Sequence, residues 1–80
     1  MIEWTFGIND EKILALSAQK DKVEVDFSKA EALSSFDFKN IVVLSKKAKA
    51  LGKEVIFKAN PELMKIFKEL GIDQIGIRFI

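Results

Sequence analysis

Two serines and an aspartate at the expected start of a long helix are the residues best placed to do chemistry. Ser34 and Ser35 come just before an amphipathic segment, and Asp37 falls within its first turn. A serine hydroxyl there can accept a hydrogen bond from a free backbone amide, or it can carry a phosphate whose charge the helix dipole favours. The residues therefore predict either an N-cap at Ser34 or Ser35, with Asp37 supporting the first turn in a Ser-x-x-Asp arrangement, or a phosphorylation site at Ser35.

Catalysis finds little support in the residue types. The 80 residues include no histidine and no cysteine, so disulfides, thiolate nucleophiles and Ser-His arrangements are excluded. Glu24 and Asp26 would lie on one face of a strand, about 7 Å apart, but no other part of a catalytic cleft converges on them. We expect no enzyme, no cofactor and no metal site.

The charges are balanced. Thirteen Lys and Arg residues against twelve Asp and Glu residues give a formal charge of +1, which provides no field to attract nucleic acid or an anionic membrane. Four lysines of the expected long helix still form a local basic face, which is usually solvated surface and alternatively a site for an acidic partner or RNA. They are Lys39, Lys46, Lys47 and Lys49.

The location follows from what the N-terminus and the hydropathy lack. No basic region leads into an apolar run, and no stretch of about eighteen apolar residues occurs. We therefore expect a cytoplasmic protein with no membrane insertion and no nucleic-acid partner.

Four stretches alternate apolar and polar residues with the period of two that a half-buried strand requires. Their apolar positions are Ile2, Trp4 and Phe6; Val23, Val25 and Phe27; Val55 and Phe57; and Ile75, Ile77 and Phe79. Glu24, Glu54 and Arg78 occupy alternate positions, which a sheet covered on both faces would not accommodate.

Two longer helices lie between these strands. The first runs from Asp37 to Leu51, has its apolar residues three and four apart, and ends at Gly52. The second has Asn60 as N-cap and Pro61 as first residue. Their apolar stripes are Phe38, Ile41, Val42, Leu44, Ala48 and Leu51 in the first, and Leu63, Met64, Ile66, Phe67 and Leu70 in the second.

The segment after the first strand has two interpretations. Asn9 or Asp10 can cap a short helix that reaches about Gln19, and a strand over Ile13 to Leu16 is the alternative.

Alternating strands and helices predict one α/β domain over residues 1–80. We expect a mostly parallel sheet of four to five strands with about three helices packed mainly on one face. The other face would be solvated or would form an interface, so a weak homodimer remains an alternative.

Several segments keep the spacing of a known family. They are Val25-Asp26-Phe27-Ser28, Leu33 to Phe38, Ala48 with Leu51-Gly52-Lys53, Asn60-Pro61, and Leu70-Gly71-Ile72-Asp73. From about Lys22 to Ile80 the chain thereby resembles the STAS family (sulfate transporter and anti-sigma factor antagonist) in register and spacing. The resemblance implies a small STAS-like fold that binds a protein partner without catalysis.

The resemblance also implies a switch. An unphosphorylated antagonist of this family binds an anti-sigma factor kinase, and phosphorylation at the helix start breaks the complex. Ser35 falls on the phosphoacceptor position, whereas Ser34, Phe36 and Asp37 replace the family's Asp, small residue and Gly. The implied partner-binding segment comprises Ser34, Ser35, Phe36, Asp37, Phe38 and Lys39.

Three aromatic residues are the remaining candidates for contact. Trp4 and Phe38 fit buried faces and are expected in the core. Phe36 lies off the helix stripe, where it would be either an exposed anchor for a partner or an aromatic folded over the core edge.

We therefore expect a STAS-like regulator of transcription that docks on an anti-sigma factor or switch kinase. The alternative is a divergent STAS scaffolding or accessory subunit, within a transport complex or in self-association, that has lost the phosphoswitch.

Overall fold

Strands and helices alternate along the whole chain. In the computed structural model, the described residues are 1–5, 7–30 and 33–80, so Phe6, which we expected in the first strand, lies outside them. Within these residues the elements are β1 (Ile2–Glu3), α1 (Asp10–Leu16), β2 (Lys22–Asp26), α2 (Ser35–Ala50), β3 (Glu54–Lys58), α3 (Pro61–Glu69), the 3₁₀ helix η1 (Ile72–Ile75) and β4 (Arg78–Phe79).

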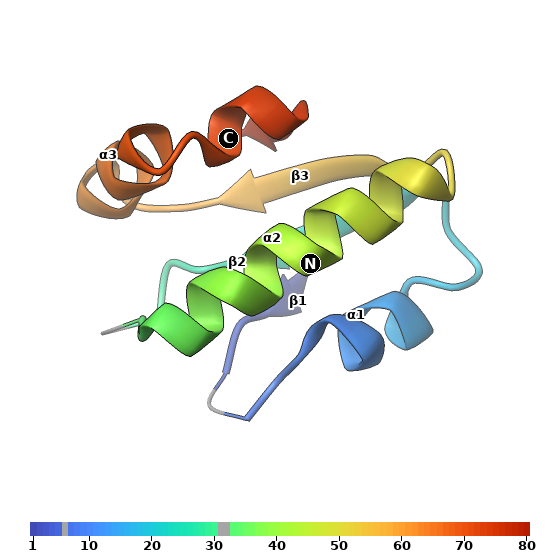
Figure 1. The fold of residues 1–80 in the computed structure, drawn as a ribbon. Coiled ribbons are helices and arrows are strands. Elements are labelled where there is room, and N and C mark those ends of the chain that lie inside the picture. The colour runs from blue at the N-terminus through green and yellow to red at the C-terminus, as the bar shows by residue number, and fades with distance from the viewer. Residues whose placement is uncertain (6, 31–32) are drawn as a thin grey trace.

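The strands of the described chain form one four-stranded, all-parallel sheet in the order β1-β2-β3-β4. Val25 of β2 pairs with Ile2 of β1 and with Phe57 of β3, so three consecutive strands share a register. Right-handed crossovers between adjacent parallel strands place their helices on the same side. Figure 1 shows α2 lying across the sheet between α1 and α3. The predicted α/β fold, with helices on one face, is confirmed.

The core lies between the sheet and this helical layer. Phe27 is fully buried at the centre of an aromatic cluster, with its ring centroid 5.2 Å from Trp4, 4.9 Å from Phe57 and 5.4 Å from Phe67. Burying one such side chain contributes about 1.5–3 kcal/mol. The alternating residues that we expected to face inward in β2 and β3 are therefore the centre of the fold.

The opposite face of the sheet carries charged side chains. Glu24 of β2 and Arg78 of β4 flank Ile56 of β3, which is only 7% exposed. Arg78 also lies 3.6 Å from Glu54, an exposed pair that is worth under about 1 kcal/mol. The helices leave this face uncovered, as the alternation predicted.

The ambiguous N-terminal segment is a helix. Asn9 caps α1 by accepting a hydrogen bond from the amide of Lys12 at 2.9 Å. The helix ends at Leu16, earlier than the expected Gln19, and the strand alternative over Ile13 to Leu16 is wrong. The cap favours the helix because it satisfies a backbone amide at the helix start.

The last strand is shorter than predicted. Ile75 belongs to η1, and only Arg78 and Phe79 pair with β3. Gly76 has a φ of 88°, a left-handed conformation that interrupts an extended chain. Ile77 is nevertheless buried, so the alternation identified its side but not the start of the strand.

Three leucine or isoleucine positions in the predicted apolar stripes are exposed. Ile66 and Leu70 of the α3 segment are 41% and 56% exposed, and Leu51 after α2 is 63% exposed. Leu51 and Leu70 are the C-cap residues of their helices, where the chain already turns away from the core.

Candidate functional site

The first turn of α2 is closed by a reciprocal cap. The hydroxyl of Ser34 accepts from the amide of Asp37 at 3.2 Å, and the Asp37 carboxylate accepts from the Ser34 amide at 2.9 Å. The Ser34 hydroxyl also donates to that carboxylate at 3.0 Å. Of the two serines that we considered as the cap, the structure selects Ser34, and Asp37 is its partner.

Ser35 is the first residue of α2 and is exposed. Its neighbour Ser34 supplies the cap, and the hydroxyl of Ser35 has no hydrogen-bond partner within residues 1–5, 7–30 and 33–80. A phosphate on Ser35 would therefore displace no intramolecular hydrogen bond of that hydroxyl in the described chain. It would meet the positive end of the α2 dipole.

Phe36 and Phe38 point in opposite directions. Successive residues of a helix are about 100° apart, so a two-residue step turns the side chain by about 200°. Phe38 is half-buried and packs with its ring centroid 6.0 Å from Phe67, as expected for a core residue. Phe36 is 70% exposed, so the interpretation in which it folds over the core edge is wrong.

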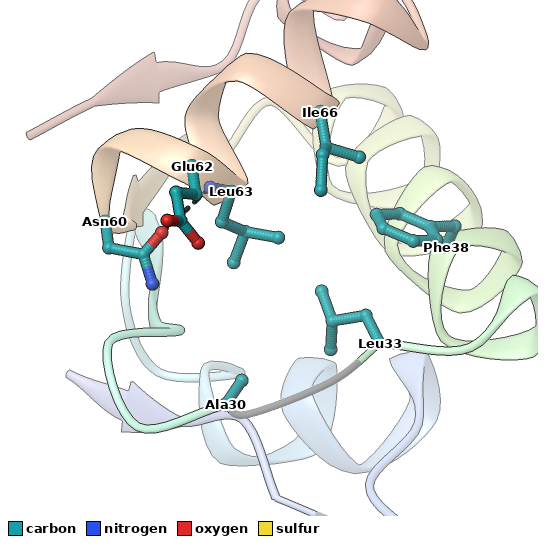
Figure 2. A pocket seen from close by; sticks show the side chains of 7 residues that line it. All are labelled: Ala30, Leu33, Phe38, Asn60, Glu62, Leu63 and Ile66. Atoms are coloured by element: carbon teal, nitrogen blue, oxygen red, sulfur yellow. Dashed lines mark hydrogen bonds between the residues drawn. The ribbon is translucent and has the colours of Figure 1, made fainter.

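An apolar hollow of about 250 Å³ lies beside this turn, between the starts of α2 and α3 (Figure 2). Its lining residues are Ala30, Leu33, Phe38, Asn60, Glu62, Leu63 and Ile66. Asn60 accepts from the Leu63 amide at 2.8 Å, and Glu62 is the one charged residue among those that line the hollow in the described chain. The hollow suits an apolar group and presents one carboxylate.

The α3 residues of this hollow were not in the predicted site. A usable signal was present, since residues that follow parallel strands meet at one edge of a sheet. Ala30 follows β2 and Asn60 follows β3, so the topology alone would have placed them together.

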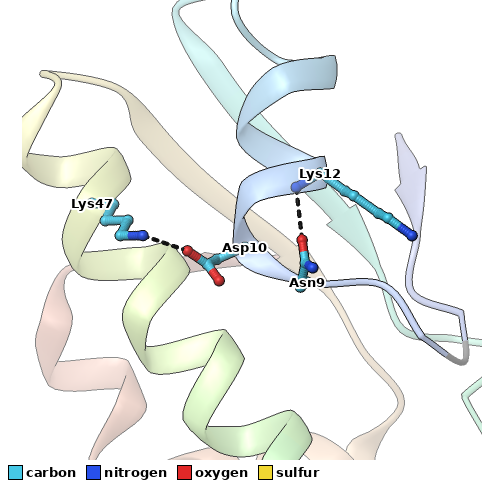
Figure 3. Close-up of polar contacts among 4 residues, drawn as sticks. All are labelled: Asn9, Asp10, Lys12 and Lys47. Carbon is cyan, nitrogen blue, oxygen red and sulfur yellow. Dashed lines mark hydrogen bonds and ion pairs between the residues drawn. The ribbon is translucent and has the colours of Figure 1, made fainter.

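The lysines of α2 fall into two groups. All four are exposed, but the Lys47 ammonium lies 2.7 Å from the Asp10 carboxylate of α1 (Figure 3), and Lys39, Lys46 and Lys49 have no such ion pair among the side chains that the structure describes. This hydrogen bond raises the pKa of Lys47. Lys47 therefore attaches α1 to α2, and the other lysines remain available to a partner.

A second carboxylate lies at the carboxyl end of β2. Two hydrogen bonds from Ser28 lower the pKa of Asp26 below its usual value of 3.8. The bond from the Ser28 side chain has the larger effect, and the bond from its backbone amide has the smaller one. The amide donates to the carboxylate at 2.8 Å. These bonds stabilise the turn that follows β2.

Glu24 and Asp26, the two carboxylates considered as an acid/base pair, lie in different surroundings. Glu24 lines a separate hollow of about 140 Å³ together with Met1 and Ser17, whereas Asp26 is held by Ser28. The described residues contain no cluster of three or more His, Cys, Asp or Glu residues that could hold a metal ion.

In the part of the chain that the structure covers, no helix is both long and apolar enough to cross a bilayer. Comparison with family models, curated proteins and solved structures finds no match to this chain.

Proposed function

We propose that this chain is a non-catalytic, STAS-like regulatory domain that binds a cytoplasmic protein, an anti-sigma factor or switch kinase, through the start of α2. The observation that carries the proposal is the 70% exposure of Phe36 next to the exposed Ser35. We call Ser34 to Lys39 the docking segment. The resemblance of the sequence to the STAS family supports the choice of partner.

Phe36 gives the docking segment its anchor. An exposed phenylalanine on a rigid helix offers a large apolar area that a partner can bury with little loss of conformational entropy. The side-chain amide of Asn40 donates to the backbone carbonyl of Phe36 at 3.2 Å. The cap at Ser34 fixes the turn that precedes Phe36. The anchor is therefore presented by a preorganised backbone.

Phosphorylation of Ser35 would change the charge of this surface. Lys39 is four residues further along α2, on the same side of the helix, so a phosphate on Ser35 could pair with it. The modified turn would remain folded, while a dianion placed in an interface adds repulsion and a desolvation cost. We propose that this charge releases the partner.

A second candidate is a scaffolding or accessory subunit without the switch. The cap favours it, because Ser34 and Asp37 bind each other where the family has Asp and Gly. Phe36 beside the acceptor would also crowd an approaching kinase. In this alternative, the docking segment binds its partner whatever the charge at Ser35.

A photo-crosslinking amino acid in place of Phe36 tests the proposal in the host cytoplasm. A matched probe replaces Leu51, which is 63% exposed at the opposite end of α2. We expect a discrete crosslinked partner from position 36 and none from position 51, with mass spectrometry to identify the partner.

The charge dependence separates the two candidates. Ser35→Asp in the chain with the position-36 probe should abolish the crosslink if the switch operates, and should leave it intact for a scaffold. Equal crosslinking from positions 36 and 51, or none from either, would contradict docking through this segment.

A further inference from the structure

The outer side of α2, which faces away from the sheet, carries a second line of apolar residues. Phe36, Val43 and Ala50 are seven residues apart, and seven residues are close to two helical turns, so they lie along one line. Phe36 and Ala50 are exposed and Val43 is half-buried. A helix that only covers a core has polar residues on this side.

Lysines fill the gaps in this line. Lys39 and Lys46 lie three residues after Phe36 and Val43, and both are exposed. Together Phe36, Lys39, Val43, Lys46 and Ala50 form what we call the α2 ridge. The only acidic residue of α2 is Asp37, whose carboxylate is engaged in the cap, so the ridge is positively charged.

No described element covers the ridge. Figure 1 shows α1 and α3 on either side of α2. The contacts of α2 with α1, β3 and η1 use its inner and lateral sides, where Ile41, Leu44 and Ala48 are fully buried. The Lys47 ammonium is turned to α1, and the ridge lysines have no acidic partner among the side chains that the structure describes.

We propose that the partner presents an acidic amphipathic helix that lies along the α2 ridge, with its apolar side on Phe36 and Val43 and its carboxylates on Lys39 and Lys46. This inference rests on the proposed function and names the chemistry of its partner. The charge complementarity identifies the occupant, because a basic helix would be repelled along the same line.

The dimensions agree with a helical occupant. The ridge extends over about four turns, or roughly 21 Å, at 1.5 Å per residue. An apolar line at seven-residue spacing fits a second helix crossing at about 20°. A partner segment of about fourteen to eighteen residues would cover it.

Nucleic acid is the other polyanion that could meet these lysines. The ridge has no arginine, and its apolar residues other than Phe36 are the aliphatic Val43 and Ala50, which give bases no stacking platform. The protein as a whole carries a formal charge of only +1. The ridge therefore favours a protein helix.

The experiment is an NMR titration of the labelled protein with a designed peptide. The probe is a helical peptide of about sixteen residues with leucines along one side and glutamates on the others. A control peptide has lysine in place of every glutamate, and a short RNA duplex is the third probe. Amide shifts at Phe36, Val43 and Ala50 report binding on the ridge.

We expect the glutamate peptide to bind on the ridge, and its affinity to fall with added salt. Lys39→Glu with Lys46→Glu should weaken binding at least tenfold, and Phe36→Ala about tenfold. The control pair Lys22→Glu and Lys58→Glu, on the charged face of the sheet, should change the affinity less than twofold.

Absence of ridge shifts with the glutamate peptide, equal affinity for the lysine peptide, or equal affinity for the RNA duplex would each overturn the acidic-helix inference. Any of these three outcomes would still be compatible with docking through Ser34 to Lys39, provided that the crosslink from position 36 is observed. Loss of that crosslink together with ridge binding of the peptide would instead count against the proposed function alone.

Discussion

At the scale of single residues, the neighbouring Ser34 and Ser35 differ in their structural role. Ser34 and Asp37 accept hydrogen bonds from each other's backbone amides, whereas the hydroxyl of Ser35 has no hydrogen-bond partner among the described residues. Residue type alone left both serines open as the cap, although only Ser34 has an acidic residue three positions later, which is the spacing of a capping box. Ser34 has the β-region backbone of an N-cap, and Ser35 is already helical.

Ser34→Ala should therefore lower the free energy of unfolding by about 1 kcal/mol, since the α2 cap is lost. Ser35→Ala should change it by less than about 0.5 kcal/mol, as is usual for an exposed residue without partners. Urea denaturation of the two variants beside the wild type checks the difference. Equal destabilisation by both would show that Ser35 shares the capping role.

Asp26 should make stability depend on pH. Its pKa is lowered below 3.8 in the folded protein by Ser28, so the stabilisation is present above pH 3.8 and is lost as the pH falls through the folded value. The stability difference between wild type and Asp26→Asn should shrink as the pH falls from about 5 through this range.

Urea midpoints at a series of pH values measure this difference. Ser28→Ala should reduce the effect, because it removes the side-chain hydrogen bond. A difference between wild type and Asp26→Asn that stays constant through the acid range would contradict the assignment.

At the scale of elements, α1 is a short helix with little buried apolar surface of its own. It has seven residues, and Ile13 is its one fully buried apolar side chain. Asp10 links it to α2 through Lys47, and Lys53 donates to the carbonyls of Ser17 and Lys20 at 2.7 Å and 2.6 Å just after its end. The helix therefore depends on a few contacts with distant residues.

Lys47→Gln should accelerate amide hydrogen exchange in α1 while exchange in α3 stays unchanged, because the ion pair to Asp10 is lost. Lys46→Gln is the matched control, since Lys46 is an exposed neighbour on the same helix. Exchange that rises equally in α1 and α3 would indicate global unfolding and would contradict this local role.

Ile13→Ala tests the packing of the same helix. The cavity left at a fully buried isoleucine should lower the free energy of unfolding by about 2–4 kcal/mol. Leu16→Ala is the control, because Leu16 is 66% exposed at the end of α1. A loss below about 1 kcal/mol for Ile13→Ala would mean that α1 is already partly detached.

The sequence identified elements best where alternation or capping was strong. Val23, Val25 and Phe27 alternate without interruption, and Asn60-Pro61 is a specific helix start, so β2 and α3 were predicted closely. β4 and the exposure of Ile66 depended on tertiary geometry. Hydropathy along one segment cannot show where the neighbouring helix ends or where Gly76 turns the chain.

At the scale of the whole molecule, the helices lie on one face of the sheet (Figure 1). They bury the inner face, the outer face carries charged side chains, and the exposed Phe36 lies on the side of α2 that faces away from the sheet. That Ser34 to Lys39 forms a docking segment stays a prediction, whereas Phe36, for which the sequence left two interpretations open, is exposed. The hollow beside α3 could be predicted only from the sheet topology and not from local patterns, because its lining residues are far apart in the sequence.

The central claim is that the start of α2 binds a protein partner with an affinity that local charge controls. The most direct test is isothermal titration calorimetry with the partner identified by crosslinking. The affinity of the wild type is compared with the affinities of Phe36→Ala, Ser35→Asp and Leu51→Ala. We predict at least tenfold weaker binding for the first two variants and less than twofold change for Leu51→Ala. Unchanged affinity for Phe36→Ala and Ser35→Asp would contradict the claim.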